Sequence, residues 1–224
     1  MRKVLTSSVI AVLVAVTTVS AAAQEPKTDE QKTLYALGVA VSQNLSAFNL
    51  TEAELEMVKA GLTDGILHKG PKADLQAYGP KIQTLQQTRL GAVAAIEKKV
   101  GQAFLDKAAA EQGATKTSSG LVITTLKPGA GPAPQATDKV KVHYHGTFTD
   151  GSVFDSSVQR GEPVTFPLNG VIRCWTEGVQ MMKVGGKSRL VCPPDLAYGD
   201  RGAPPRIKPG ATLVFEVELL DIVK

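Results

Sequence analysis

Between residues 28 and 112 the apolar positions recur three or four residues apart, which is the spacing of one face of a helix. A first helix is predicted by the stripe Leu34, Leu37, Val41, Leu45 and Phe48. A second helix begins at a capping box formed by Thr51 and Glu54, carries apolar residues as far as Ile66 and ends near Gly70.

A third helix is expected to start near Pro80, because proline suits the first helical turn, and to run to about Gln112. It would form a rod of about 50 Å. Its apolar stripe is narrow and is interrupted by Arg89: Ile82, Leu85, Val93, Ile96, Val100 and Phe104. Two shorter helices cannot cover this stripe, so we expect it to pack on the C-terminal half of the chain or on a second copy. A monomeric helical spacer is the alternative.

After Gly113 a polar connector leads to alternating apolar and polar positions, separated by clusters of Gly and Pro. Val140, Val142, Tyr144 and Gly146 alternate with polar residues, as in a half-buried strand. Asp150-Gly151 is a hairpin signal, and further strands are expected at residues 188–192 and 212–221. Residues 171–182 have a helical pattern of about three turns.

These patterns predict an α+β chain with two domains. Residues 24–112 would form an all-helical domain with one long helix. Residues 113–224 would form an antiparallel twisted sheet wrapped on one short helix.

The first 23 residues are typical of a secretory signal peptide. A charged start with Arg2 and Lys3 is followed by an apolar run at residues 9–16 and by small residues up to Ala23. The run is interrupted by polar residues and is shorter than the roughly twenty residues that a membrane anchor needs. We therefore expect an exported chain that begins near Gln24 and has no membrane span. The expected location is the periplasm, with outer-membrane association or secretion as alternatives.

Composition and charge narrow the class of protein. Hydrophobic residues make up 43% of the 224 positions and charged residues 21%, as in ordinary globular proteins. The formal net charge is +4, and Arg2 and Lys3 of the predicted leader supply two of these charges. The remaining excess is too small to indicate a nucleic-acid partner.

Cys174 and Cys192 are the only cysteines, and eighteen positions separate them. This spacing excludes a Cys-x-x-Cys redox motif and disfavours a thiol oxidoreductase. In an oxidising compartment the two residues are expected to form a structural disulfide. Two unpaired buried thiols are the alternative.

The chain offers little for acid–base, covalent or metal chemistry. His143 and His145 share a strand face, but two ligands without a third do not make a metal site. The sequence has no nucleophile elbow, no phosphate-binding glycine loop and no metalloprotease helix motif. We therefore expect no metal and no cofactor.

Five segments of the C-terminal half, in order, resemble the FKBP family of peptidyl-prolyl cis/trans isomerases. They are Val142 to Gly146, Asp150 to Ser157, Val171 to Gly178, Leu196 to Gly199 and Ala211 to Leu220. The helical half is similar in layout to the dimerisation domain of the macrophage-infectivity-potentiator branch. Together the resemblance covers about 200 residues and implies a dimeric isomerase.

The resemblance also implies the residues of a proline site. Those expected to act in catalysis are Phe154, Asp155, Trp175, Tyr198 and Phe215, and those expected to bind substrate are Tyr144, Val164, Val171, Ile172 and Ile207. Trp175 would form the floor. Three residues depart from the family pattern and affect the rim and substrate preference: Val164 replaces an aromatic, Arg206 replaces an apolar residue and Cys174 replaces a glycine.

The chemistry explains why such a site is aromatic. Rotation about an X-Pro bond destroys amide resonance over a barrier of about 18–20 kcal/mol, and no covalent bond needs to break. The twisted amide is less charge-separated than the planar one, so a dry aromatic slot favours the transition state. The resemblance implies that the Ile172 N–H and the Tyr198 hydroxyl hold substrate carbonyls. Asp155 would orient Tyr144 or polarise the twisting amide.

The partners implied are proline-containing or unfolded exported proteins, a second copy of the chain and inhibitors of the macrolide type. The helical domain would add chaperone activity. The alternative function is a dimeric chaperone or peptide-binding module in which isomerase activity is incidental. For the aromatic residues themselves, the alternative is that they only fill the core.

Overall fold

The computed structural model describes residues 25–223, so the predicted signal peptide lies outside the described residues. The chain divides into two compact units, residues 1–40 and 41–224. The described part of the first unit is residues 25–40, which include most of helix α1 (Asp29–Leu45). The predicted domain boundary at residues 112 and 113 stays a prediction. None of the described helices is long and apolar enough to cross a membrane.

The helical half contains three α-helices, as predicted. After α1, the short 3-10 helix η1 (Ser46–Phe48) leads to α2 (Glu52–Ile66) and α3 (Leu75–Ala109). The capping box is confirmed, because the Glu54 N–H donates to Thr51 Oγ1 and the Thr51 N–H donates to the Glu54 carboxylate.

The predicted limits of the long helix were wrong at both ends. Helix α3 begins five residues before Pro80, where Asp74 caps it by accepting a hydrogen bond from the Gln76 N–H at 2.9 Å. Pro80 lies in the second turn, so its missing N–H costs only one hydrogen bond near the start of the helix. The helix ends at Ala109, short of Gln112.

Arg89, which interrupts the predicted stripe of α3, makes an ion pair with the start of α2. Its guanidinium donates to Glu54 Oε1 at 2.5 Å and to the carbonyl oxygen of Phe48 at 3.4 Å. The hydrogen bond from Arg89 lowers the pKa of Glu54 to about 2. The polar residue in the stripe therefore connects two helices.

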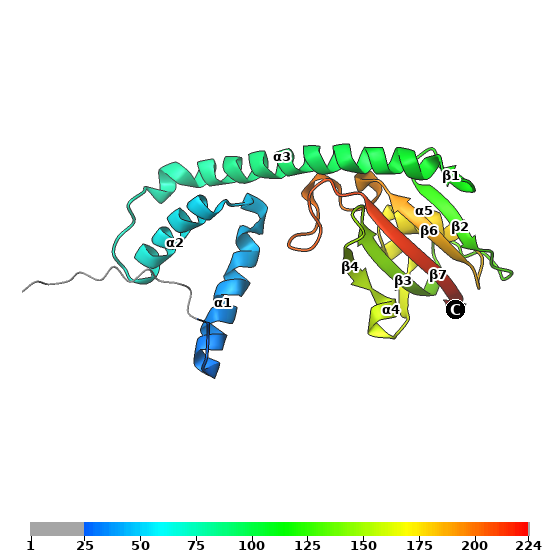
Figure 1. The fold of residues 1–224 in the computed structure, drawn as a ribbon, viewed down its shortest axis with the longest axis horizontal. Helices are drawn as coiled ribbons and strands as arrows, with labels where there is room; N and C mark the ends of the chain where they lie inside the picture. Colours follow the sequence, from blue (N-terminus) through cyan, green and yellow to red (C-terminus); the bar gives the residue numbers. More distant parts are fainter. Residues whose placement is uncertain (1–24, 224) are drawn as a thin grey trace, which may run out of the picture. The chain divides into compact units, whose positions relative to one another are not determined.

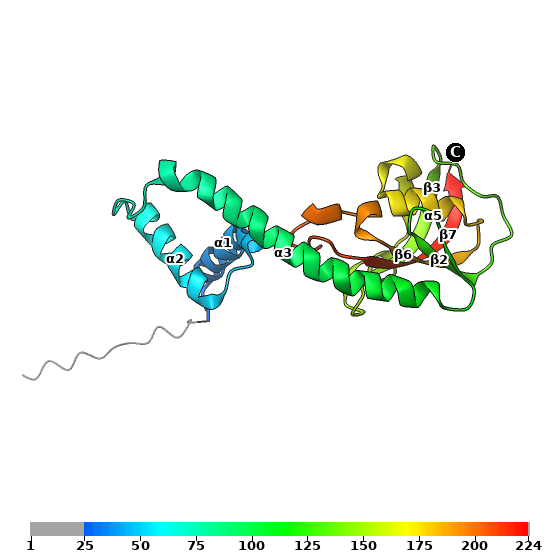
Figure 2. The same cartoon turned by 90° about the horizontal axis from the view of Figure 1, so that it is seen from above.

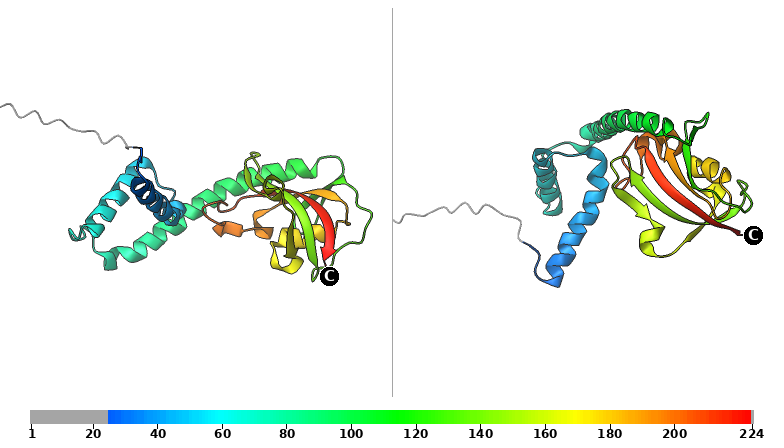
Figure 3. Two further views of the ribbon diagram at one scale, coloured as in Figure 1. Left: turned by 90° about the horizontal axis from the view of Figure 1, so that it is seen from below. Right: turned by 45° about the vertical axis from the view of Figure 1, so that its right-hand side comes forward.

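The C-terminal half is a seven-stranded sheet with antiparallel pairing throughout (Figure 1). The strands are β1 (Ala114–Lys116), β2 (Val122–Lys127), β3 (Lys139–Phe148), β4 (Val153–Ser156), β5 (Val164–Pro167), β6 (Lys187–Cys192) and β7 (Leu213–Val223). Their order is β1-β2-β6-β7-β3-β4, and β5 pairs with the first part of β3. The longest strands, β3 and β7, run side by side in opposite directions (Figure 3). The predicted α+β class is confirmed.

Two short helices accompany the sheet, α4 (Ser157–Arg160) and α5 (Arg173–Gln180). Helix α5 has eight residues, or about two turns rather than the three predicted. It is shorter because Val171 and Ile172 have extended backbone and only lead into it. The other 3-10 turns are η2 (Leu168–Gly170), η3 (Pro194–Leu196) and η4 (Gly199–Arg201).

The sheet is covered on both faces in its middle, by α5 on one face and by the second half of α3 on the other (Figures 1 and 2). Successive residues of a strand point to opposite faces. Leu190, Cys192 and Phe215 therefore join the large core around α5, whereas Val191 and Val214 join the smaller core with Leu105 and Ala108 of α3. Helix α3 therefore packs on the C-terminal half of the chain, which was one of its two expected partners; the other was a second copy of the chain.

The residues of α3 that become buried are not the predicted stripe. The buried residues of α3 are Ala94, Gly101, Leu105 and Ala108. All of them except Leu105 are small, and Leu105 follows the stripe residue Phe104 in the sequence. Of the predicted stripe, Phe104 is partly buried, whereas Ile82, Leu85, Ile96 and Val100 remain exposed. The small residues allow the helix to approach the sheet closely. A Cβ atom at Gly101 would meet the Thr212 side chain, whose hydroxyl is buried.

Alanine substitutions at two glycines of α3 should therefore have opposite effects. Gly91→Ala adds a Cβ in open space and should raise the free energy of unfolding by about 0.5–1 kcal/mol, since alanine favours helix. Gly101→Ala should lower it by about 1–3 kcal/mol because Thr212 must move. Urea unfolding measures both. Equal effects at the two positions would contradict the close approach of α3 to Thr212, the residue that precedes β7.

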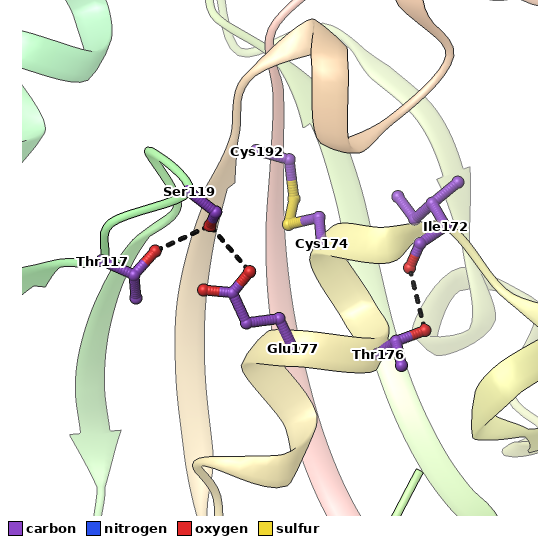
Figure 4. Close-up of a disulfide and its surroundings, with 7 residues drawn as sticks. All are labelled: Thr117, Ser119, Ile172, Cys174, Thr176, Glu177 and Cys192. Atoms are coloured by element: carbon purple, nitrogen blue, oxygen red, sulfur yellow. Dashed lines mark hydrogen bonds between the residues drawn. A yellow bond between two sulfur atoms is a disulfide. The ribbon is translucent and has the colours of Figure 1, made fainter. Parts of the chain in front are cut away.

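A disulfide joins Cys174, near the start of α5, to Cys192, at the end of β6 (Figure 4). Their Cα atoms are 5.7 Å apart, and both side chains are fully buried. A hydrogen bond of 2.7 Å from Ser119 Oγ to Glu177 Oε2 holds the same helix to the connector before β2. Helix α5 is therefore attached to the sheet covalently as well as by packing.

Replacing both cysteines by alanine should lower the free energy of unfolding by about 3 kcal/mol, because the disulfide restrains a loop of about 18 residues in the unfolded chain. Urea unfolding with and without a thiol reductant measures this difference. The reductant should destabilise the natural protein and leave the double variant unchanged. Two titratable thiols in the oxidised natural protein would contradict the pairing.

Candidate active site

A cavity of about 580 Å³ opens between α5, the strands β3, β4, β5 and β7, and the turn that follows β6. We call it the aromatic cavity. Eight of the ten predicted site residues line it: Tyr144, Phe154, Asp155, Val171, Ile172, Trp175, Tyr198 and Phe215. Its volume falls within the range of pockets that hold small ligands or a few residues of peptide.

Trp175 lies at the centre of the aromatic cluster. Its ring makes edge-to-face contacts with Tyr144, Phe166 and Phe215, at centroid distances of 5.2, 5.9 and 5.4 Å. Only 4% of the residue is exposed, and its indole N–H has no hydrogen-bond partner among the described residues. A buried unpaired donor costs about 1–3 kcal/mol, unless a ligand supplies the acceptor.

Strand register brings the walls of the cavity together. Tyr144 belongs to β3 and Phe215 to β7, and these strands pair directly, with Gly146 opposite Phe215. Phe154, on β4, packs its ring at 90° to Phe215 with a centroid distance of 5.4 Å. A Cβ atom at Gly146 would lie 2.7 Å from the Phe154 ring and 3.1 Å from the Phe215 ring. Only glycine leaves room for both aromatic side chains here.

Two predicted site residues do not line the cavity. Val164 is half-buried on β5 and packs against the core, and Ile207 is buried in the core. Phe166 lines the cavity in place of Val164, two residues further along the same strand face. Position 166 therefore has the aromatic side chain that position 164 lacks. Residues two apart in a strand lie on the same face, so the sequence could have indicated Phe166 as an alternative to Val164. Gly170 and Ala197 also line the cavity and were not predicted.

Asp155 belongs to a hydrogen-bonded triad with Tyr144, which the sequence reasoning had named as a residue for Asp155 to orient, and with Arg160, which it did not find. The Tyr144 hydroxyl donates to Asp155 Oδ2, and Arg160 donates both to Asp155 Oδ1 and, at 3.0 Å, to the Tyr144 oxygen. Ser156 caps α4 by accepting from the Gln159 N–H at 3.1 Å, and this short helix places Arg160 beside Asp155.

The triad fixes the charge state of its members. Burial opposes ionisation of Asp155, but hydrogen bonds from Tyr144 and Arg160 outweigh it and lower the pKa of the carboxyl group. Burial, followed by the hydrogen bond to Asp155, raises the pKa of the Tyr144 hydroxyl. At neutral pH the triad therefore consists of an aspartate, a neutral tyrosine and an arginine.

Ile172 and Tyr198 are the residues that the resemblance expects to hold substrate carbonyls. No backbone hydrogen bond in the described part of the chain uses the Ile172 N–H, whereas the Ile172 carbonyl accepts from Trp175 and Thr176. Tyr198 is 42% exposed at the rim.

His143 and His145 lie on β3, where their Nδ1 atoms are 3.1 and 3.0 Å from the hydroxyls of Ser157 and Ser156. Both imidazoles are therefore engaged by serine hydroxyls.

Two family models match the chain. The FKBP-type peptidyl-prolyl cis-trans isomerase model matches residues 131–220, and the model of the domain amino-terminal to such isomerases matches residues 30–123.

Individual relatives agree with these matches. The FKBP-type isomerase FkpA of Aeromonas hydrophila is 42% identical over 214 residues, which cover 89% of this chain and 79% of the relative. The macrophage infectivity potentiator of Trypanosoma cruzi is 48% identical over 126 residues, 56% of this chain and 64% of its own length. The crystal structure of FkpA from Escherichia coli is 38% identical and aligns with a TM-score of 0.65, covering 88% of this chain and 97% of that one.

Tyr144→Phe should raise the pKa of Asp155, because the carboxylate loses one of the hydrogen bonds that stabilise its charge. A depressed carboxyl pKa stabilises the fold above the unfolded value of about 3.9, and this contribution is lost as the pH falls through the folded value. The variant should therefore lose less stability on acidification than the natural protein.

Carbon-13 NMR of the Asp155 carboxyl group measures the pKa directly. Tyr198→Phe is the matched control and should leave it unchanged, because no hydrogen bond joins Tyr198 to Asp155 within the described residues. An identical Asp155 pKa in the natural protein and the Tyr144 variant would show that the triad does not act as described.

Proposed function

The chain belongs to the FKBP-type peptidyl-prolyl cis-trans isomerases, and from this membership we propose that it isomerises prolyl bonds of exported proteins as a periplasmic homodimer. Its helical half would hold unfolded clients near the catalytic half. The leader-like sequence of residues 1–23 and the disulfide support export to an oxidising compartment. Outer-membrane association and secretion are the alternatives.

The aromatic cavity is the observation that carries the proposal. Its floor and walls are the rings of Trp175, Tyr144, Phe154, Phe166 and Phe215, which exclude water from a bound proline. In such a site the planar, charge-separated amide loses more solvation than the twisted one, so the barrier to rotation falls. Desolvation of this kind requires no acid, base or cofactor.

The polar groups at the cavity have proposed roles at its edge. The free N–H of Ile172 and the hydroxyl of Tyr198 would bind the carbonyl groups on either side of the proline. Asp155, held ionised by its hydrogen bonds from Tyr144 and Arg160, would orient the Tyr144 hydroxyl or polarise the twisting amide. Val171 would contact the proline ring, whereas Val164 and Ile207 would support the walls from behind.

The exposed apolar side chains of α1 and α2 support the homodimer and the client-holding surface. Leu34 and Leu37 are 60% and 61% exposed, and Met57 and Ile66 are 75% and 72% exposed. Apolar surface of this kind marks sites of association. It also favours the second candidate function, a dimeric chaperone in which isomerase activity is incidental.

Trp175→Ala should reduce kcat/KM for a proline-containing tetrapeptide by at least about tenfold, or about 1.4 kcal/mol of barrier. The reason is that the variant opens the floor of the cavity to water. Leu126→Ala is the control, because this leucine is exposed on β2 and does not line the cavity. A macrolide inhibitor should compete with the peptide in the natural protein. Equal losses in both variants, at a matched folded fraction, would contradict the assignment of the cavity.

Leu34→Lys should convert the dimer to a monomer, because it places a charge on the apolar surface of α1. The monomer should isomerise a tetrapeptide as well as the natural protein does, and should act more slowly on a refolding protein limited by proline isomerisation, since it has lost the second active site. Thr33→Lys, which adds the same charge at a polar position of α1, should change neither. Sedimentation measures the oligomeric state of each variant, and the tetrapeptide and refolding assays measure its activity. A natural protein that sediments as a monomer at micromolar concentration would refute the dimer.

A further inference from the structure

A second cavity, of about 520 Å³, adjoins the aromatic cavity. The two share Phe154 and Asp155 as lining residues. A polypeptide that places its proline against Trp175 and continues past Phe154 would therefore enter this second space. We call it the arginine cavity, because Arg160 and Arg206 both line it.

The two arginines differ in their partners. Arg160 donates to Asp155 and to the Tyr144 hydroxyl, so its charge is compensated within the protein. Arg206 is exposed and has neither an ion pair nor a hydrogen bond among the described residues. The nearby Lys208 pairs with Glu97 at 2.8 Å. Arg206 is therefore the lining arginine whose positive charge has no acidic partner among the described residues.

The rest of the lining of the arginine cavity is mixed: Phe148, Val153 and Phe154 are apolar, and Asp155, Ser156 and Gln159 are polar. The rings of Phe148 and Phe154 pack at a tilt of 53° with a centroid distance of 5.1 Å, and Val153, which is 42% exposed, also lines the cavity. Gln159 adds an amide at the edge. These walls suit the methylene groups of a side chain, and the free guanidinium suits a carboxylate at its end.

We propose that the arginine cavity is a substrate subsite that accepts a glutamate or aspartate side chain adjacent to the proline, paired with Arg206. This subsite rests on the proposed function, since it selects among prolyl bonds. Arg206 stands where the resembling family usually has an apolar residue, so the preference would belong to this chain. Arg206 would determine specificity without taking part in the rotation itself.

Two sets of tetrapeptides test the proposal, one with Glu, Gln or Lys immediately before the proline and one with the same residues immediately after it. At one of the two positions kcat/KM should rank Glu above Gln and Gln above Lys, with a difference of about two- to fivefold between Glu and Gln. The difference should shrink at 1 M salt, where the Debye length falls to about 3 Å.

Arg206→Gln should abolish the ranking, so that the Glu, Gln and Lys peptides are turned over with similar kcat/KM. Arg201→Gln is the matched control, because Arg201 is exposed in the same loop and does not line the cavity, so this variant should keep the full preference for Glu. Trp175 is the only tryptophan, and its fluorescence on titration with each peptide gives a second ranking, by affinity, that does not depend on turnover.

The outcomes separate the subsite from the isomerase function. Normal turnover of Gln peptides without any preference for Glu at either position would overturn the subsite and leave the isomerase function intact. A preference that persists in Arg206→Gln, or that disappears equally in Arg201→Gln, would also overturn it. Absence of turnover together with a Glu preference in fluorescence would support the subsite and contradict the catalytic role.

Discussion

The burial of one indole ring is the constraint on which the catalytic half depends. Trp175 is 96% removed from solvent, and its ring contacts three aromatic side chains at close to right angles. The same ring is part of the hydrophobic core and the floor of the aromatic cavity. The same cluster therefore stabilises the fold and lines the cavity, so a change that loosens the core also deforms the cavity.

Several independent features hold that ring in place. The disulfide joins the residue before Trp175 to β6, and Ser119 holds Glu177 of the same helix. The Ile172 carbonyl accepts from the Trp175 N–H at 2.9 Å at the start of α5, and the Ile172 N–H makes no backbone hydrogen bond among the described residues. Cys174 thus secures the helix that carries Trp175.

Helix α3 supports the site from the opposite face of the sheet. Its small residues lie close to the strand β7 that carries Phe215, and its charged residues reach the loop after Tyr198. Lys98 pairs with Asp200 at 2.5 Å and Glu97 with Lys208 at 2.8 Å. A Cβ atom at Gly210 would lie 2.6 Å from the Ala94 carbonyl oxygen, so backbone meets backbone there. The rim of the cavity is consequently fixed by a helix that precedes the sheet in sequence.

The sequence alone predicted the three helices of the helical half, the strands β3, β6 and β7 and the order of the site motifs. The capping box at Thr51 and the period of two along β3 and β7 depend on neighbours a few residues apart, so they were predictable. Tertiary structure decided what depends on distant neighbours. The small residues of α3 pack on the sheet, whereas most of its predicted apolar stripe does not. Phe166 rather than Val164 lines the cavity. Helix α4 places Arg160 beside Asp155. Spacing along the chain gives the face on which a side chain lies, whereas the partner that this face meets is set only when strands and helices pack together.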